Sequence, residues 1–216
     1  GSEMCIRDSN KHAGMIYASN LCHEIAQNVG FTNLAEEIIN EDGTITTKTN
    51  TGDMVTCNLN SISLGRISDE ELEENIALQI RMLDNVISIN QAPVPESRMT
   101  SDKYRAIGLG TSGYHHYLVN HDIQWESDEH IEVADKLFEN IAYYSIKASM
   151  ELAKEKGAFP AFKGSEWETG EYFTRRGYTS DRWKQLASDV AKYGIRNGYL
   201  MAVAPTCLLY TSDAAD

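Results

Sequence analysis

The sequence has little positive charge and no long apolar run. Its 19 Lys and Arg residues stand against 32 Asp and Glu residues, which gives a formal net charge of -13. A protein that binds nucleic acid needs a basic face, so this balance argues against a nucleic-acid partner. A membrane-spanning helix needs roughly 18 or more consecutive apolar residues, and no stretch comes near that length. We therefore expect neither nucleic acid nor a membrane among the partners.

Cysteine is scarce as well, with four in 216 residues. Chains that depend on disulfides are usually small and secreted, whereas this chain is large and shows no secretory signal. A reducing, cytoplasmic compartment is therefore predicted. The composition, 42% hydrophobic and 24% charged, is typical of a globular protein with one large or two small domains.

The two ends of the chain are related at the level of DNA. The sequence MCIRDS, residues 4–9, can be encoded by DNA whose reverse complement encodes CLLYTS, residues 207–212, in another frame. This inverted repeat resembles the transposon end of tagmentation sequencing libraries. We therefore expect residues 1–9 and 207–216 to be translated adapter and residues 10–206 to be an internal piece of a longer protein. On this interpretation Cys5 and Cys207 have no function.

The segment SNLCHEI, residues 19–25, concentrates reactive side chains. In an extended chain the side chains alternate between two faces, so Asn20, Cys22 and Glu24 would point the same way. An amide, a thiol and a carboxylate would then form one row, whereas a helix would scatter them. A lone cysteine is more often a small core residue, so this row by itself leaves a structural role open.

Apolar spacing predicts both helices and strands, and hence an α/β architecture. A capping box at Ser68–Glu71 precedes a helix over about 69–88, and Ser127 and Gly157 bound the longest helix. A third helix is expected over about 180–193. Strands are expected at 54–59 and 199–204, and a surface hairpin is expected to turn at Asp42-Gly43.

A second reactive stretch, CNLNSISL, begins at Cys57. Together, SNLCHEI and CNLNSISL resemble the catalytic, or alpha, subunit of class I ribonucleotide reductases. The resemblance continues through KYRAIGLGTSGYHHYL, YYSIKASMELAKEKG and NGYLMAVAPT, in the order of the family. It implies a partial ten-stranded α/β barrel of the ribonucleotide reductase and glycyl radical enzyme type, with long flanking helices.

The resemblance implies an oxidoreductase, a ribonucleoside-diphosphate reductase that makes deoxyribonucleotides by thiyl-radical chemistry with a redox dithiol. Cys22 matches the cysteine that becomes a thiyl radical and removes the 3′ hydrogen of the substrate ribose. Glu24 matches the base that acts on the 3′ hydroxyl, and Asn20 matches the amide that binds the substrate and this carboxylate.

Further site residues follow from the same resemblance. Cys57 matches one of the two redox-active cysteines that reduce the 2′ carbon and leave as a disulfide; the alternative is a buried structural thiol. Ser19 is assigned to substrate binding. Pro205 and Thr206 match the opening of the phosphate-binding loop, although the sequence after them departs from the Gly/Ser/Thr run of the family.

The resemblance also implies cofactors and partners. No cofactor or metal is expected on this chain, because the metal-radical cofactor belongs to a small radical-generating subunit and allosteric nucleotides bind other segments of the enzyme. The other partners are the ribonucleoside diphosphate substrate, a thioredoxin- or glutaredoxin-like reductant and a second copy in a homodimer. The fragment alone is expected to be inactive, since a cut barrel leaves strand edges unpaired.

Three alternatives remain open. A class II, adenosylcobalamin-dependent reductase shares the roles of the Cys, Glu and Asn residues. A non-catalytic binding or structural fragment would be indicated if Cys57 lay far from Cys22 and Glu24. The G-x-G-x-x-G at Gly108–Gly113 matches a dinucleotide-binding pattern, but it lacks an acid about 20 residues later. We therefore interpret these glycines as close packing at a helix start, and a strand–turn–helix at Gly108 as the minimum for the dinucleotide alternative.

Overall fold

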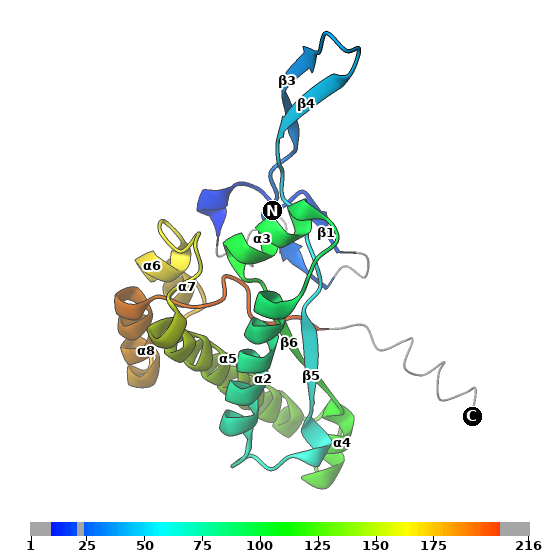
Figure 1. The fold of residues 1–216 in the computed structure, drawn as a ribbon. Helices are drawn as coiled ribbons and strands as arrows, with labels where there is room; N and C mark the ends of the chain where they lie inside the picture. The colour runs from blue at the N-terminus through cyan, green and yellow to red at the C-terminus, as the bar shows by residue number, and fades with distance from the viewer. Residues whose placement is uncertain (1–9, 21–23, 204–216) are drawn as a thin grey trace, which may run out of the picture.

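Two parallel strands, β5 (Leu59–Ser63) and β6 (Gly108–Ser112), organise the body of the molecule. The computed structural model describes residues 10–20 and 24–203, and the statements below refer to these residues. The strands pair in register from Leu59 with Gly108 to Ser63 with Ser112. In Figure 1 the helices α2 (Leu72–Ile89) and α5 (Asp128–Lys156) lie to one side of the strands, and a long hairpin projects from the end opposite to helix α4 (Tyr114–Asn120).

A third extended segment, residues 199–202, runs alongside β6 in the same direction. The Ile107 N–H donates to the Tyr199 carbonyl at 3.0 Å, the Ala202 N–H donates to the Leu109 carbonyl at 3.2 Å, and Leu109 forms a parallel bridge with Met201. The three segments lie side by side in chain order and are joined by helices, as in the wall of an α/β barrel. Within the described ranges the wall does not close on itself.

The strand expected at 54–59 begins only at Leu59, so most of that prediction is wrong. Upstream of Leu59 the backbone follows helix α3 (Pro95–Tyr104) rather than a neighbouring strand. The Met54 N–H donates to the Thr100 hydroxyl at 2.8 Å, and the Thr56 and Ser101 hydroxyls are 3.0 Å apart. Hydrogen bonds to side chains of α3 therefore take the place of the backbone hydrogen bonds to a neighbouring strand that the apolar pattern predicted. Similarly, the strand expected at 199–204 is reduced to one bridge, and Ala204 lies outside the described residues.

The first long helix, α2 (Leu72–Ile89), buries the apolar stripe that its spacing predicted. It begins three residues later than expected, because residues 69–71 form a turn. One half of the capping box is present: the Glu71 carboxylate accepts the Ser68 N–H at 3.0 Å. The buried positions are Leu72, Ile76, Ile80, Leu83 and Ile87.

The longest helix, α5 (Asp128–Lys156), confirms its predicted bounds. The Ser127 hydroxyl accepts the His130 N–H at 3.1 Å, and Gly157 ends the helix with a φ of 83°. The apolar spacing of this helix also predicts that Ile131 and Phe138 are buried, which is wrong, because they are 66% and 42% exposed. Burial begins at Leu137. The third predicted helix, α8 (Asp181–Tyr193), is confirmed. No helix in the described part is both long and apolar enough to cross a membrane.

Short elements complete the described chain. Two 3-10 turns are present: η1 (Lys11–Ala13) precedes strand β1 (Ala18–Ser19), and η2 (Leu64–Arg66) precedes α2. Helix α4 (Tyr114–Asn120) follows β6. Between α5 and α8 the chain forms two short helices, α6 (Glu166–Thr169) and α7 (Glu171–Arg175). Helix α6 packs against both α7 and α8.

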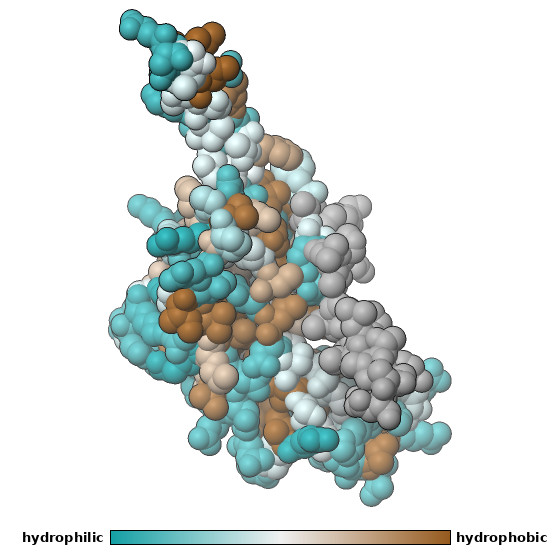
Figure 2. Space-filling model, turned by 45° about the vertical axis from the view of Figure 1, so that its right-hand side comes forward, coloured by the Kyte–Doolittle hydropathy of each residue, from teal (hydrophilic) through white to brown (hydrophobic). Residues whose placement is uncertain are grey.

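The hairpin expected at Asp42-Gly43 is confirmed as strands β3 (Asn33–Ile39) and β4 (Ile45–Asn50). Gly43 has a φ of 82°, and the Asp42 carboxylate accepts the Thr44 N–H at 2.9 Å, which closes the turn. Every residue of both strands is exposed. Figure 2 shows apolar side chains gathered near its tip, where Ile39 is 77% exposed.

The first two glycines of the G-x-G-x-x-G pattern lie inside β6, so their placement at a helix start is wrong. A Cβ at Gly108 would come within 2.8 Å of the Ala202 Cβ, and one at Gly110 would overlap the Ala202 carbonyl oxygen. Close packing is therefore the reason for both. Only Gly113, with a φ of 68°, lies at the start of α4. Although the order is strand–turn–helix, the glycines pack on the chain's own backbone, where a dinucleotide pyrophosphate has no room.

A buried carboxylate joins the helices to the parallel wall. Asp84 on α2 is fully buried, and its Oδ1 lies 2.6 Å from Arg105 Nε and 3.2 Å from Arg196 Nε. Its Oδ2 lies 3.3 Å from Lys156 Nζ at the end of α5, and Asn197 Nδ2 donates to Oδ1 at 3.4 Å. Segments separated by more than 100 residues in sequence thus converge on one side chain.

Replacing this carboxylate should strongly destabilise the fold. Asp84→Asn leaves the buried Arg105 without its counter-charge, and breaking a buried ion pair costs about 3–5 kcal/mol. We expect a lower urea midpoint for the variant chain, followed by circular dichroism. As a matched control, Glu151→Gln removes an exposed partner of Lys154 and should change the unfolding free energy by less than about 0.5 kcal/mol. Equal effects of the two variants would contradict the role of the network.

The same network predicts an acid dependence. Burial alone would raise the pKa of Asp84, but the hydrogen bond and charge of Arg105, together with Arg196, hold that pKa below its usual value. A carboxyl with a depressed pKa in the folded state stabilises the fold above its unfolded pKa of about 4 and loses this effect as the pH falls further. The difference in stability between wild type and Asp84→Asn should therefore be constant from pH 7 to about 5 and shrink below about pH 4. Denaturation series at each pH measure it.

Candidate functional site

A tight antiparallel loop near the start of the chain carries the first reactive stretch. Strands β1 (Ala18–Ser19) and β2 (Ala26–Gln27) pair at its base. The Asn20 N–H donates to the Ile25 carbonyl at 3.3 Å, and the Ile25 N–H donates to Asn20 Oδ1 at 2.8 Å. Asn20 and Glu24 are therefore not helical, and they flank residues 21–23. Cys22 itself lies outside the described residues.

The second reactive stretch comes directly against this loop. Asn20 Nδ2 donates to Cys57 Sγ at 2.9 Å, and Cys57 Sγ lies 3.7 Å from Glu24 Oε1. Asn20 is buried, whereas Cys57 is exposed, so the alternative of a buried structural thiol is wrong. An amide, a thiol and a carboxylate from two distant segments thus form one cluster.

Contacts on either side hold Cys57 in place. Upstream, Asp53 pairs with Lys103 Nζ at 3.1 Å on α3. Downstream, Asn58 Nδ2 donates to the Ala106 carbonyl at 3.3 Å, and the Gly108 N–H donates to the Asn58 carbonyl at 2.8 Å. The thiol is therefore positioned by the start of β6 and by α3, although its own segment forms no strand.

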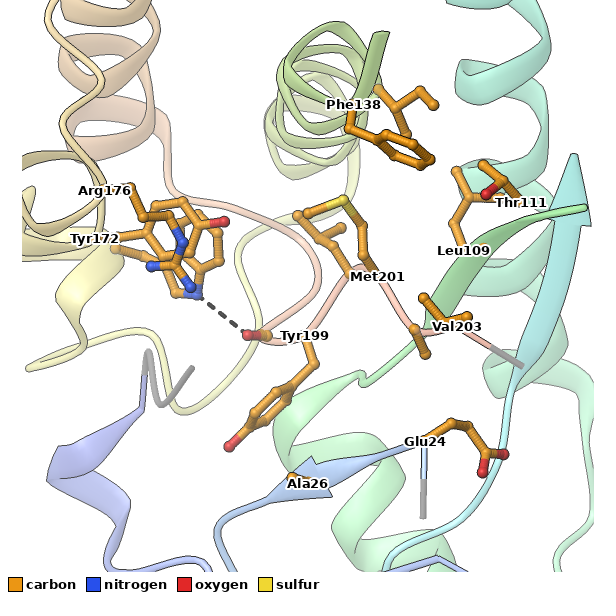
Figure 3. A pocket seen from close by; sticks show the side chains of 16 residues that line it. Glu24, Ala26, Leu109, Thr111, Phe138, Tyr172, Arg176, Tyr199, Met201 and Val203 are labelled. Carbon is orange, nitrogen blue, oxygen red and sulfur yellow. Dashed lines mark hydrogen bonds between the residues drawn. The ribbon is translucent and has the colours of Figure 1, made fainter. Parts of the chain in front are cut away.

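A pocket of about 530 Å³ opens beside Glu24. Its floor is the extended segment 198–203, and its walls come from β6, α5 and α7 together with Arg176. Figure 3 shows Glu24 at one side and Arg176 with Tyr172 at the other, with Met201 between them. Small-molecule sites commonly occupy about 300–1,000 Å³ and combine apolar walls with a few polar groups, so the pocket can hold a nucleotide-sized ligand.

The walls and floor are fixed by specific contacts. The Arg176 guanidinium lies 3.8 Å from the centre of the Tyr172 ring, and burial raises the pKa of Tyr172 to about 12, which keeps this phenol neutral. The Gly198 carbonyl accepts hydrogen bonds from Trp167 Nε1 at 3.1 Å and from Asn10 Nδ2 at 3.0 Å. The dashed line in Figure 3 marks the first of these.

The other predicted site residues are placed as follows. The Ser19 hydroxyl donates to the Asn20 carbonyl at 3.3 Å, and Ser19 does not line the pocket. Pro205 and Thr206 lie outside the described residues, although the floor leads to them. Tyr199 and Arg176 line the pocket and were not singled out from the sequence. For Tyr199 the available signal is its place in NGYLMAVAPT, a motif of the resemblance that also reads as an apolar strand but assigns no role to the tyrosine.

Comparisons with known proteins agree with this geometry. The family model described as "Ribonucleotide reductase, barrel domain" matches residues 4–208. The ribonucleoside-diphosphate reductase subunit alpha of Treponema pallidum (strain Nichols) is 52% identical over 203 residues, which cover 91% of this chain and 24% of that protein. The subunit alpha of Helicobacter pylori (strain J99) is 36% identical, and the match covers 91% of this chain and 31% of that protein.

A third relative shows the same relation. The subunit alpha of Chlamydia muridarum (strain MoPn / Nigg) is 34% identical over 226 residues, which cover 94% of this chain and 20% of that protein. The chain thus spans between a fifth and a third of the length of these relatives. Because the family match extends over nearly the whole chain, the protein belongs to the ribonucleotide reductase family, in its barrel domain.

Proposed function

We propose that the chain is the catalytic part of a class I ribonucleoside-diphosphate reductase alpha subunit. The observation that carries the proposal is the cluster in which Cys57 Sγ lies between Asn20 Nδ2 and Glu24 Oε1, beside the loop that contains Cys22. A purely structural fragment has no need to expose a thiol next to a carboxylate at a pocket. The relatives named above carry this activity in their names.

In the proposed reaction, a thiyl radical on Cys22 takes the 3′ hydrogen of the substrate ribose, which forms an S–H bond and leaves a carbon radical. Glu24 takes the proton of the 3′ hydroxyl. The amide of Asn20 accepts the Ile25 N–H and donates to Cys57, and this holds it beside the carboxylate. The two hydrogen bonds between Asn20 and Ile25 support the placement of Asn20 next to Glu24.

Cys57 is proposed as one thiol of the redox pair. The 2′ hydroxyl takes up a proton and leaves as water, and two electrons and a second proton pass to the substrate as Cys57 and a second cysteine form a disulfide. Cys22 then returns its hydrogen to the 3′ carbon, which restores the thiyl radical, and Glu24 returns its proton to the 3′ oxygen. The second thiol is assigned to the longer protein. A thioredoxin- or glutaredoxin-like dithiol would then reduce the disulfide, which requires Cys57 to be accessible in some state of the enzyme.

The remaining assignments concern the whole enzyme. The initiating radical is supplied by a small metal-containing subunit, the alpha subunit forms a homodimer, and the substrate is a ribonucleoside diphosphate whose phosphates reach the loop that begins at Pro205 and Thr206. We keep Ser19 as a proposed substrate-binding residue, because it lies next to Asn20 at the base of the same loop. We place the enzyme in the cytoplasm, because dithiol chemistry needs a reducing compartment.

Cysteine replacements in the full-length reductase test the radical and redox roles. Cys22→Ser should abolish turnover, since a hydroxyl cannot replace the thiyl radical. Cys57→Ser should abolish multiple turnover, because the dithiol is incomplete. Deoxyribonucleotide formation with the matched small subunit and a dithiol reductant measures both. Near-normal activity of Cys22→Ser would rule out the assignment, and activity that needs adenosylcobalamin instead of the small subunit would favour class II.

Glu24→Gln tests the base. The amide has nearly the volume of the carboxylate but cannot take the proton, and general base catalysis contributes about 10²–10⁴-fold to a rate. We expect kcat to fall by about that factor, with the thermal midpoint close to that of wild type. The exposed Glu132→Gln on α5 is the matched control and should leave kcat unchanged. A Glu24→Gln enzyme with wild-type kcat would remove Glu24 from the chemistry.

A further inference from the structure

One hydroxyl ties the reactive loop to the floor of the pocket. The Tyr199 hydroxyl donates to Asn28 Oδ1 and accepts the Asn28 N–H at 3.1 Å. Asn28 follows β2 by one residue and is fully buried. Tyr199 belongs to the floor, where its carbonyl accepts the Ile107 N–H at 3.0 Å next to β6. Figure 3 shows the Tyr199 ring reaching from the floor toward the strand that carries Ala26.

Asn28 in turn holds the base of the loop. Its side-chain amide donates to the Gly14 carbonyl, and the neighbouring Val29 N–H donates to the Met15 carbonyl at 3.3 Å. The segment that leads into β1 is therefore attached to the segment that follows β2, at Asn28 and at Val29. Strands β1 and β2 are only two residues long each, so their own ladder is a weak support.

The position of Glu24 relative to Cys57 consequently depends on two anchors. One is the direct hydrogen bond from Asn20 to Cys57, at the reactive end of the loop. The other is the Tyr199–Asn28 contact at its base. Reacting groups must be held to well within an ångström, and a misplacement of about 1 Å can cost about 100-fold in rate.

We propose that Tyr199 is a positioning residue, which through Asn28 sets the place of Glu24 beside the pocket floor. The proposal rests on the reductase function proposed above. Tyr199 also lines the pocket, but its ring and its hydroxyl have different roles: the residue forms part of the floor, and the hydroxyl holds the loop.

Tyr199→Phe tests the role of the hydroxyl by itself, because it keeps the ring and removes only the hydroxyl. In the full-length reductase with its small subunit, kcat should fall by about 10-fold to 100-fold. The KM for each ribonucleoside diphosphate should stay within about twofold of the wild-type value, since the variant keeps the aromatic ring at the pocket. Steady-state assays with the four diphosphates measure both constants. The matched control is Tyr193→Phe on α8, which removes a hydroxyl away from the site and should change neither constant.

A double-mutant cycle tests the route through Asn28. Asn28→Ala removes the Oδ1 that accepts from the Tyr199 hydroxyl and also the amide that donates to Gly14, so kcat should fall at least as far as in Tyr199→Phe. Adding Tyr199→Phe should then cause less than its full single-variant loss, because the side-chain contact is already broken and only the bond from the Asn28 N–H to the hydroxyl remains. Losses that multiply would overturn the proposal, as would wild-type kcat in Tyr199→Phe. Failure of Tyr199→Phe to fold, or a lower thermal midpoint with unchanged kcat, would show a structural role only. If the wild-type enzyme itself lacks reductase activity, or Cys22→Ser retains it, the proposed function fails whatever Tyr199→Phe does.

Discussion

The buried carboxylate of Asp84 is the interaction on which the rest of the structure depends. It gathers Arg105, Lys156 and Arg196 from three helix ends and loops onto α2. Two of these residues lie just before segments that shape the site: Arg105 leads into β6, and Arg196 leads into the pocket floor. A buried charge is tolerated only when it is paired, so the segments that carry these residues must all be in place for α2 to pack stably.

The two parallel strands run side by side away from the cluster of Asn20, Glu24 and Cys57, because Cys57 lies just before the start of β5 and β6 begins beside Asn58. The cluster itself is built differently, from short strands and side-chain hydrogen bonds to a loop. A rigid wall with reactive groups on attached loops is a common arrangement in α/β enzymes, because loops at strand ends can carry chemistry without disturbing the core. The exposed thiol of Cys57 and the half-buried Glu24 are such reactive groups, because both lie outside the buried core.

The helices were predictable from the sequence because their signals are local. Ser127 as a cap, Gly157 as a stop and an apolar residue every three or four positions define α5 without reference to the rest of the chain. The hairpin at Asp42-Gly43 was predictable for the same reason. The strands were less so: at 54–58 helix α3 supplies the hydrogen-bond partners, and Gly108 and Gly110 form a strand because Ala202 packs against them. These partners lie between 46 and 94 residues away in the sequence, so no local sequence pattern indicates them.

For the candidate site, the sequence alone determined which groups are available. The period-two spacing of Asn20, Cys22 and Glu24, and the order of the motifs, pointed to thiol and carboxylate chemistry and to the family. Only the tertiary structure decided that Cys57 meets Glu24 and Asn20, that Ser19 turns to the backbone, and that Tyr199 holds Asn28. The reason is physical: side-chain alternation follows from backbone geometry within a few residues, whereas contacts across 37 or 171 residues depend on how the whole core packs.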